Sequence, residues 1–192
     1  IRVGGIDFYS GKPGAQVDAC RALRSPGSAL KPFVYALAIE SGRLYPTEAM
    51  LDDSLDYGLY NPANFDGLYR GLVSAAEALR LSLNTPAVNV LERLGAERMR
   101  QFLRSAGLTT LSKPGEYYGL GLALGSCEVR LEELAGAYAA LAALGEWRPP
   151  RFFLASRTEP PKRILDSGTC KAVMAMLEQP LPGDLAGQAA SA

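Results

Sequence analysis

Ser28 and Lys31 are the two residues of this chain whose types and spacing could do chemistry. They form its single Ser-x-x-Lys, within the run Arg24-Ser25-Pro26-Gly27-Ser28-Ala29-Leu30-Lys31-Pro32-Phe33. A serine hydroxyl becomes a useful nucleophile when a nearby base takes its proton, and a lysine can be that base if desolvation or nearby cations lower its pKa. The structural alternative makes Ser28 a helix N-cap and Lys31 a solvated helix residue.

The element that must position this pair is a helix predicted from Leu30 to Ile39. The Pro26-Gly27 turn brings Ser28 to its N-terminus, and Ser41-Gly42 is typical of a helix end. Side chains at i and i+3 are neighbours on a helix, so the Lys31 amine can reach the Ser28 hydroxyl. The partial positive charge and free N–H groups of a helix N-terminus also favour a developing alkoxide or oxyanion.

Ser82 and Asn84 form a second polar pair, on a predicted connector between two helices. It is the single Ser-x-Asn of the chain. The serine could relay a proton and the asparagine could hold a substrate amide. The alternative is an ordinary helix-to-helix joint, in which both side chains bond to the local backbone.

The composition excludes several classes of site. The chain has 192 residues, is 48% hydrophobic and carries 20 basic and 20 acidic residues, which predicts one domain over 1–192 and no nucleic-acid partner. It has no histidine, which excludes Ser-His-Asp catalysis and histidine-ligated zinc. The widely spaced Cys20, Cys127 and Cys170 are expected to be buried apolar residues. We expect neither a metal nor another cofactor.

The remaining pattern predicts an α+β fold. Segments 1–9 and 16–23 are interpreted as a hairpin, and 44–71, rich in Tyr, Asp, Asn, Pro and Gly, as an ordered irregular region. A capping box at Ser74 and Glu77 opens a helix, and Thr85 is predicted to be the N-cap of the next. The further predictions are helices over 96–105 and 128–144, strands over 151–157 and 163–165, and a last helix capped by Ser167.

The two motifs together resemble a known family. Ser-x-x-Lys followed by Ser-x-Asn and later by Lys-Thr-Gly is the signature of penicillin-binding proteins and serine β-lactamases. The surrounding sequence is similar to the transpeptidase domain of the class A penicillin-binding proteins over nearly the whole chain. The runs that carry this similarity, besides the one around Ser28, are Leu81-Ser82-Leu83-Asn84-Thr85-Pro86-Ala87-Val88, Leu122-Ala123-Leu124-Gly125 and Leu134-Ala135-Gly136-Ala137-Tyr138-Ala139.

The resemblance implies a fold, a reaction and four site residues. The fold would be that of the penicillin-binding proteins and serine β-lactamases. The domain would cross-link peptidoglycan stem peptides ending in D-Ala-D-Ala through an acyl-serine intermediate, and β-lactam antibiotics would acylate it. Ser28 would be the nucleophile and Lys31 its general base. Ser82 would carry the proton towards the leaving group, and Asn84 would bind the substrate amide and help to fix Lys31.

The resemblance also implies a location and a longer parent protein. The domain would act at the periplasmic face of the bacterial inner membrane, with an upstream membrane anchor and a glycosyltransferase domain. The chain departs from the family pattern because it has no Lys-Thr-Gly; Ser167-Gly168-Thr169 is similar but is interpreted as a helix cap. We therefore expect a fragment that ends before the third motif and lacks some of the C-terminal strands of the fold. An enzyme fragment that is inactive because this motif is absent is one of the alternatives.

Two other functions remain open on the sequence. A serine β-lactamase or β-lactam sensor has the same fold and motifs, but a β-lactamase would hydrolyse its acyl-enzyme rapidly. A non-catalytic binding module would keep the motif residues for packing. That last alternative predicts that Ser28 faces no cleft or that the Lys31 amine points into bulk solvent.

Overall fold

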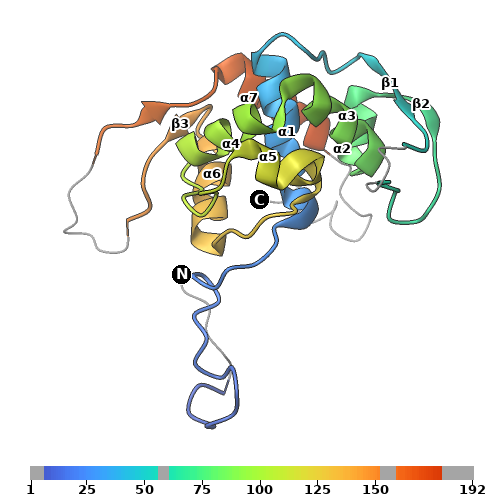
Figure 1. Cartoon of the computed structure of the whole chain (residues 1–192). Helices are drawn as coiled ribbons and strands as arrows, with labels where there is room; N and C mark the ends of the chain where they lie inside the picture. The colour runs from blue at the N-terminus through green and yellow to red at the C-terminus, as the bar shows by residue number, and fades with distance from the viewer. Residues whose placement is uncertain (1–6, 56–60, 152–158, 179–192) are drawn as a thin grey trace, which may run out of the picture.

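The computed structural model describes residues 7–55, 61–151 and 159–178 of the chain (Figure 1). Within these ranges it is a helical body with two short antiparallel hairpins at its edges. The elements in chain order are η1 (Gly27–Leu30), α1 (Lys31–Glu40), β1 (Ala49–Asp52), β2 (Gly71–Ser74), α2 (Ala75–Arg80), α3 (Asn84–Leu94), α4 (Ala96–Ser105), α5 (Gly115–Tyr118), η2 (Gly119–Leu124), α6 (Leu131–Ala142), β3 (Glu146–Trp147), β4 (Lys162–Arg163) and α7 (Ser167–Leu177).

Helix α1 is the centre of the body. Residues 31–38 are all buried, as expected for a helix that is apolar on every side. The helix packs against α3, α4 and α7, and Figure 1 shows it passing through the middle of the bundle. The predicted helix start and end are confirmed to within one or two residues, except that a 3-10 turn, η1, precedes it. Ser28 therefore belongs to the turn that leads into the most buried helix.

The segment 44–71, interpreted from sequence as irregular, contains a strand that was not predicted. β1 pairs with β2 in antiparallel register from Ala49 opposite Ser74 to Asp52 opposite Gly71. Met50 and Val73 are buried on one face, whereas Leu51 and Leu72 are exposed on the other. A strand of four residues carries too little alternation to stand out in a segment dominated by turn-forming residues.

The predicted N-terminal hairpin is wrong in its described part. Residues 7–23 form successive turns and project from the body as an arm (Figure 1), and the β-pairing in this region is a single bridge between Arg24 and Val129. Residues 1–6 lie outside the described ranges. Within the predicted second strand, the Asp18 carbonyl accepts from the N–H groups of Arg21 and Ala22 and the Asp18 side chain accepts from the Cys20 N–H, so these residues turn instead of extending.

The other predicted helices are confirmed, with two corrections to their caps. Ser74 does cap α2, because its side chain accepts a hydrogen bond from the Glu77 N–H. Thr85 does not cap α3, which begins one residue earlier at Asn84; the threonine hydroxyl is buried and bonded elsewhere. Asp166 rather than Ser167 caps α7, accepting from the Gly168 N–H at 2.7 Å.

The C-terminal part of the described chain adds one small hairpin. β3 and β4 pair with Glu146 opposite Arg163 and Trp147 opposite Lys162, on the far side of the body from β1 and β2 (Figure 1). The strand predicted over 151–157 falls almost entirely outside the described residues. In the parts of the chain that the structure describes, none of the helices has the length and apolar character that crossing a membrane requires.

Candidate active site

Ser28 lies in η1, immediately before the central helix. Its carbonyl accepts a hydrogen bond from the Lys31 N–H, an i to i+3 bond that closes the 3-10 turn. With three residues per turn, side chains at i and i+3 lie one above the other. Ser28 is exposed, and its hydroxyl has no hydrogen-bond partner among the described residues. The local spacing therefore stacks the serine on the lysine and leaves its hydroxyl open to solvent.

The Lys31 side chain runs inward and is 1% exposed. Its amine donates to three oxygens of the α2–α3 joint: the Ser82 carbonyl, the Ser82 Oγ at 3.2 Å and the Asn84 Oδ1 at 2.7 Å. The structure thus brings the two motifs together at one amine. Ser28 is not among the hydrogen-bond partners of that amine.

Burial changes the acid–base properties of Lys31. Desolvation lowers the pKa of its amine from 10.5 to about 8. Its three acceptors are all neutral, and no carboxylate pairs with it among the described residues, so no opposite charge offsets the loss of water. An amine of this kind can release its proton near neutral pH and so can act as a base.

Ser82 adopts a strained backbone conformation at the end of α2. Its φ is +56°, in the left-handed region that non-glycine residues rarely occupy. The N–H groups of Ser82 and Leu83 bond back to the carbonyls of Leu79 and Ala78, which is the Schellman pattern that usually carries glycine. This turn directs the Ser82 carbonyl to the Lys31 amine. A left-handed residue costs about 1 to 2 kcal/mol, and such strain is often found at functional sites.

Asn84 is held from the opposite side by the segment before β2. Its side-chain Nδ2 donates to the Ala63 carbonyl at 2.6 Å, and its backbone N–H donates to Asn64 Oδ1 at 2.7 Å. Because Nδ2 is committed to a carbonyl, Oδ1 is left to accept from Lys31. The predicted contact between Asn84 and Lys31 is present, but Ala63 and Asn64 were not singled out from the sequence.

The glycine-rich stretch around η2 supports the turn that carries Ser28. Gly125 has φ +78°, and a Cβ built on it would lie 2.3 Å from the backbone nitrogen of Gly27. Ser25 Oγ donates to the Gly125 carbonyl at 2.7 Å. On the other side, the Tyr138 hydroxyl donates to the Ala29 carbonyl at 2.8 Å. The sequence analysis interpreted these glycines as positions of close backbone packing, and Gly125 is one.

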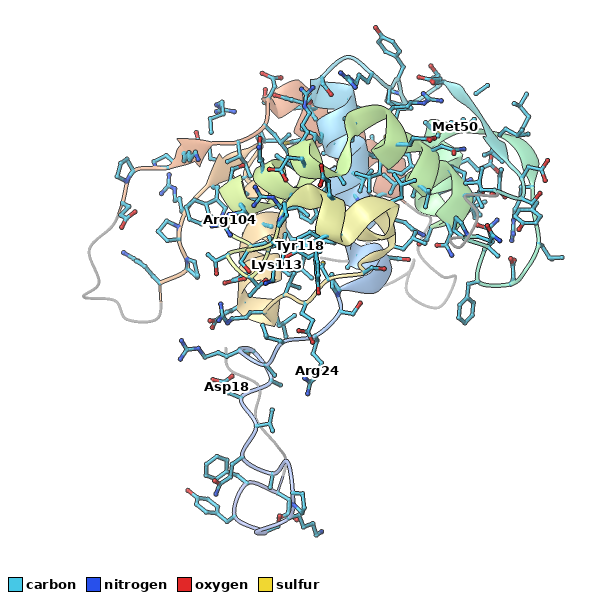
Figure 2. The ribbon with its side chains drawn as sticks, viewed as in Figure 1. Asp18, Arg24, Met50, Arg104, Lys113 and Tyr118 are labelled. Atoms are coloured by element: carbon cyan, nitrogen blue, oxygen red, sulfur yellow. The ribbon has the colours of Figure 1, made fainter. Side chains whose placement is uncertain are left out.

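Two hollows adjoin these residues. One of about 190 Å³ is lined by Ser82 with Asn64, Phe65 and Arg70 among others. A second of about 460 Å³ adjoins the contact between Ser25 and Gly125 and includes Lys113 and Tyr118, which lie next to each other in Figure 2. Of the four predicted site residues, Ser82 lines the smaller hollow and none lines the larger one; Ser28 is in the lining of neither.

The described cysteines carry no reactive feature. Cys20, Cys127 and Cys170 are all free; the first and third are buried and Cys127 is half-buried. Burial, with a smaller effect from Glu128, raises the pKa of the Cys127 thiol to about 11. No cluster of three or more acidic or cysteine side chains within the described ranges could hold a metal ion.

Comparison with known proteins places the chain among proteins that share its two motifs. Residues 7–186 match the model of the penicillin binding protein transpeptidase domain. The chain is 38% identical over 94% of its length to penicillin-binding protein 1C of Escherichia coli (strain K12), the protein that its motif sequences resemble in detail. It is 33% identical over 98% of its length to penicillin-binding protein 1F of Bacillus subtilis (strain 168). It spans 24% and 28% of the lengths of these two relatives.

A solved structure shows the same fold. The apo structure of the transpeptidase domain from Burkholderia pseudomallei penicillin-binding protein 3 superposes with a TM-score of 0.73 at 22% identity. The alignment covers 83% of this chain and 54% of that one. The predicted α+β fold class is therefore confirmed. The chain belongs to the family of penicillin-binding protein transpeptidase domains.

Proposed function

We propose that this chain is the acyl-transfer domain of a peptidoglycan DD-transpeptidase, with Ser28 as nucleophile and Lys31 as general base. The observation that carries the proposal is the Lys31 amine, which is buried and hydrogen-bonded to Ser82 and Asn84 of the second motif. The non-catalytic alternative predicted either a solvated Lys31 amine or a Ser28 that faces no cleft. The amine is buried, which counts against the first sign, whereas Ser28 lines neither of the two hollows described above. The transpeptidase family of the chain supports the same reaction class.

The chemistry assigns one step to each residue. Neutral Lys31 accepts the proton of the Ser28 hydroxyl while Ser28 Oγ forms a bond to the carbonyl carbon of the penultimate D-Ala. The C–N bond to the terminal D-Ala then breaks, and the proton passes from Lys31 through the Ser82 hydroxyl, 3.2 Å away, to the leaving nitrogen. A stem-peptide amine then attacks the acyl ester, the bond to Ser28 Oγ breaks, and the proton lost by the amine returns through Lys31 to the Ser28 hydroxyl. A β-lactam follows the first step and stays attached to Ser28.

The remaining roles concern the substrate and the cellular setting. Asn84 would bind the substrate amide through the side of its carboxamide that does not hold Lys31. We place the parent protein at the periplasmic face of the bacterial inner membrane, held by an upstream anchor and joined to a glycosyltransferase domain. The names of the two curated relatives, both penicillin-binding proteins, support this setting.

The experiment is labelling of the full-length protein with a fluorescent penicillin. The wild type should become covalently labelled, and Ser28→Ala should abolish labelling because the bond-forming oxygen is gone. Ser54→Ala is the matched control, since this exposed serine lies outside the turn that carries Ser28 and accepts no acyl group in the proposed mechanism. Undiminished labelling of Ser28→Ala would remove Ser28 from the mechanism.

The lifetime of the adduct separates transpeptidase from hydrolase. A transpeptidase should retain the penicilloyl group on Ser28 for minutes to hours, detected as a mass increase on the peptide that contains residues 25–31. Return of the unmodified mass within seconds would identify a β-lactamase instead.

A further inference from the structure

Asp52 is a buried carboxylate that the proposed mechanism does not use. It is 0% exposed at the end of β1. Three groups donate to it: Asn64 Nδ2, at 2.9 Å from both oxygens, the Arg70 N–H at 2.8 Å and the Thr85 hydroxyl at 2.5 Å. Burying a carboxylate is costly, and hydrogen bonds only partly offset the cost. A hydrophobic residue at the same place would close the hairpin without that cost.

The carboxylate decides which way the Asn64 amide faces. An asparagine side chain has two donors on Nδ2 and an acceptor at Oδ1. Asp52 can only accept, so it takes the Nδ2 side, and Nδ2 also donates to the Leu68 carbonyl at 2.9 Å. Oδ1 must then face the other way, where it accepts from the Asn84 N–H at 2.7 Å. With the amide reversed, a donor would face this N–H.

The same chain of hydrogen bonds reaches the lysine of the site. Asn84 begins α3, and its side chain is clamped between the Ala63 carbonyl and the Lys31 amine. A displacement of the Asn84 backbone therefore moves the Oδ1 that holds Lys31. A continuous path of hydrogen bonds therefore runs from the buried Asp52 carboxylate through Asn64 and Asn84 to the Lys31 amine. At each step, the donor or acceptor that one group presents determines which kind of group the next must present.

We propose that Asp52 and Asn64 are positioning residues: Asp52 fixes the orientation of the Asn64 amide, which fixes Asn84 and, through it, the Lys31 amine. Asp52 is fully buried, and Asn64, although it lines the smaller hollow, has its amide engaged by Asp52, Leu68 and Asn84. This inference rests on the proposed function, because the rate it governs is that of acylation at Ser28.

Asp52→Asn tests the path with almost no change in shape. The new amide keeps one oxygen for Asn64 Nδ2 but places a donor where the other oxygen was, 2.9 Å from the same nitrogen. This donor–donor contact removes much of the preference for the present orientation of Asn64, and the reversed amide presents a donor to the Asn84 N–H. An unpaired buried donor costs about 1 to 3 kcal/mol. We therefore expect acylation by a fluorescent penicillin at saturating concentration to slow by about 10-fold or more. The dissociation constant of the non-covalent complex should change less than 3-fold.

Thr85→Val is the matched control. It also removes one hydrogen bond from the Asp52 carboxylate, but it leaves the Asn64 amide held in the same direction. We expect acylation within about 3-fold of wild type. Equal slowing by Asp52→Asn and Thr85→Val would overturn the proposal, because loss of any bond to the buried carboxylate would then have the same effect.

Exchanging the residue types at positions 52 and 64 separates a positioning role from a general loss of stability. In the double variant Asp52→Asn, Asn64→Asp, the carboxylate at position 64 accepts from both the new amide and the Asn84 N–H, but it loses the bond that Asn64 Nδ2 donates to the Leu68 carbonyl, so the recovery is partial. At least a 3-fold recovery of the acylation rate over Asp52→Asn is expected. A double variant as slow as or slower than the single one would count against the path.

Two further measurements keep the outcome decisive. If Asp52→Asn fails to fold, Asn64→Ala replaces it: this variant keeps the carboxylate, leaves the Asn84 N–H without its acceptor and should also acylate at least 10-fold more slowly. Unchanged acylation in whichever variant folds overturns the proposal. Loss of labelling in Ser28→Ala together with that result would reject only the positioning role, whereas persistent labelling in Ser28→Ala would reject the proposed function itself.

Discussion

At the scale of single residues, the site depends on a lysine that is buried without a counter-ion. Lys31 is surrounded by neutral oxygens from Ser82 and Asn84, and its amine has a pKa of about 8. At pH 7 about a tenth of such amines are neutral, compared with fewer than one in a thousand for a solvated lysine. Burial thus provides a base near neutral pH without a histidine, which the chain lacks.

The acylation rate should therefore rise with pH and level off above a midpoint near pH 8. Only the neutral amine can accept the Ser28 proton, and its fraction increases as pH passes the pKa of about 8. The measurement is the second-order rate constant for fluorescent penicillin from pH 6 to 9.5. Lys31→Arg, which stays charged, should be unreactive throughout. A flat profile in the wild type would exclude Lys31 as the base.

At the scale of elements, the turn that presents Ser28 is built by contact between two short 3-10 segments. η1 packs against η2, and the end of η2 brings Gly125 against the backbone of Gly27. The approach is so close that no side chain fits between the two glycines. Tyr138 from α6 anchors the next carbonyl, that of Ala29, so the turn that carries Ser28, the proposed nucleophile, is held from two sides by segments distant in sequence.

Gly125→Ala should misplace Ser28 and slow acylation at least 10-fold. The added methyl would meet Gly27 at 2.3 Å and would require a left-handed conformation that costs alanine about 1 to 2 kcal/mol. Gly136→Ala is the control, because this glycine lies in α6 with nothing within 4 Å of an added Cβ. That variant should be as reactive as wild type and as stable or more so. Comparable reactivity of both variants would contradict the role of Gly125.

At the scale of the whole molecule, the candidate site lowers the free energy of unfolding. The buried charge of Lys31 and the left-handed Ser82 are both unfavourable, and the surrounding core compensates for them. The sign of the pH effect follows from the pKa values. Between about pH 8 and 10.5 the unfolded chain retains a lysine proton that the folded chain has released, so the free energy of unfolding rises with pH over this window.

Lys31→Met should stabilise the 192-residue chain at pH 7 while removing its reactivity. The thioether fills similar space and carries no charge to desolvate, but it leaves the Ser82 carbonyl and Asn84 Oδ1 without their donor. The net gain in the free energy of unfolding is therefore expected to be about 1 kcal/mol. The gain should shrink between pH 8 and 10, as the wild type loses its buried charge. Denaturant unfolding of both proteins at pH 7 and pH 10 measures it. A gain that did not change with pH would show that the buried charge is not its source.

Local spacing explains how much of this arrangement the sequence could predict. The i to i+3 relation of Ser28 and Lys31, the largely apolar sequence of α1, the capping box at Ser74 and the joint at Ser82 all depend on neighbours along the chain. Such features are determined by helix geometry and by local hydrogen bonding. The sequence by itself therefore determined the longer helices and the four candidate site residues, whereas the short segments η1, α5 and η2 were not predicted.

Only the tertiary structure decided what surrounds those residues. Whether the Lys31 amine meets Asn84 depends on the packing of α1 against α3, and local spacing says nothing about that contact. β1 was missed because four residues hold little periodicity, and with it the sequence missed Asp52. Thr85 was assigned to a cap because such roles are local, yet its hydroxyl bonds to Asp52, 33 residues earlier. A hydrogen bond between distant segments leaves no pattern in either, since it forms only when the core brings them together.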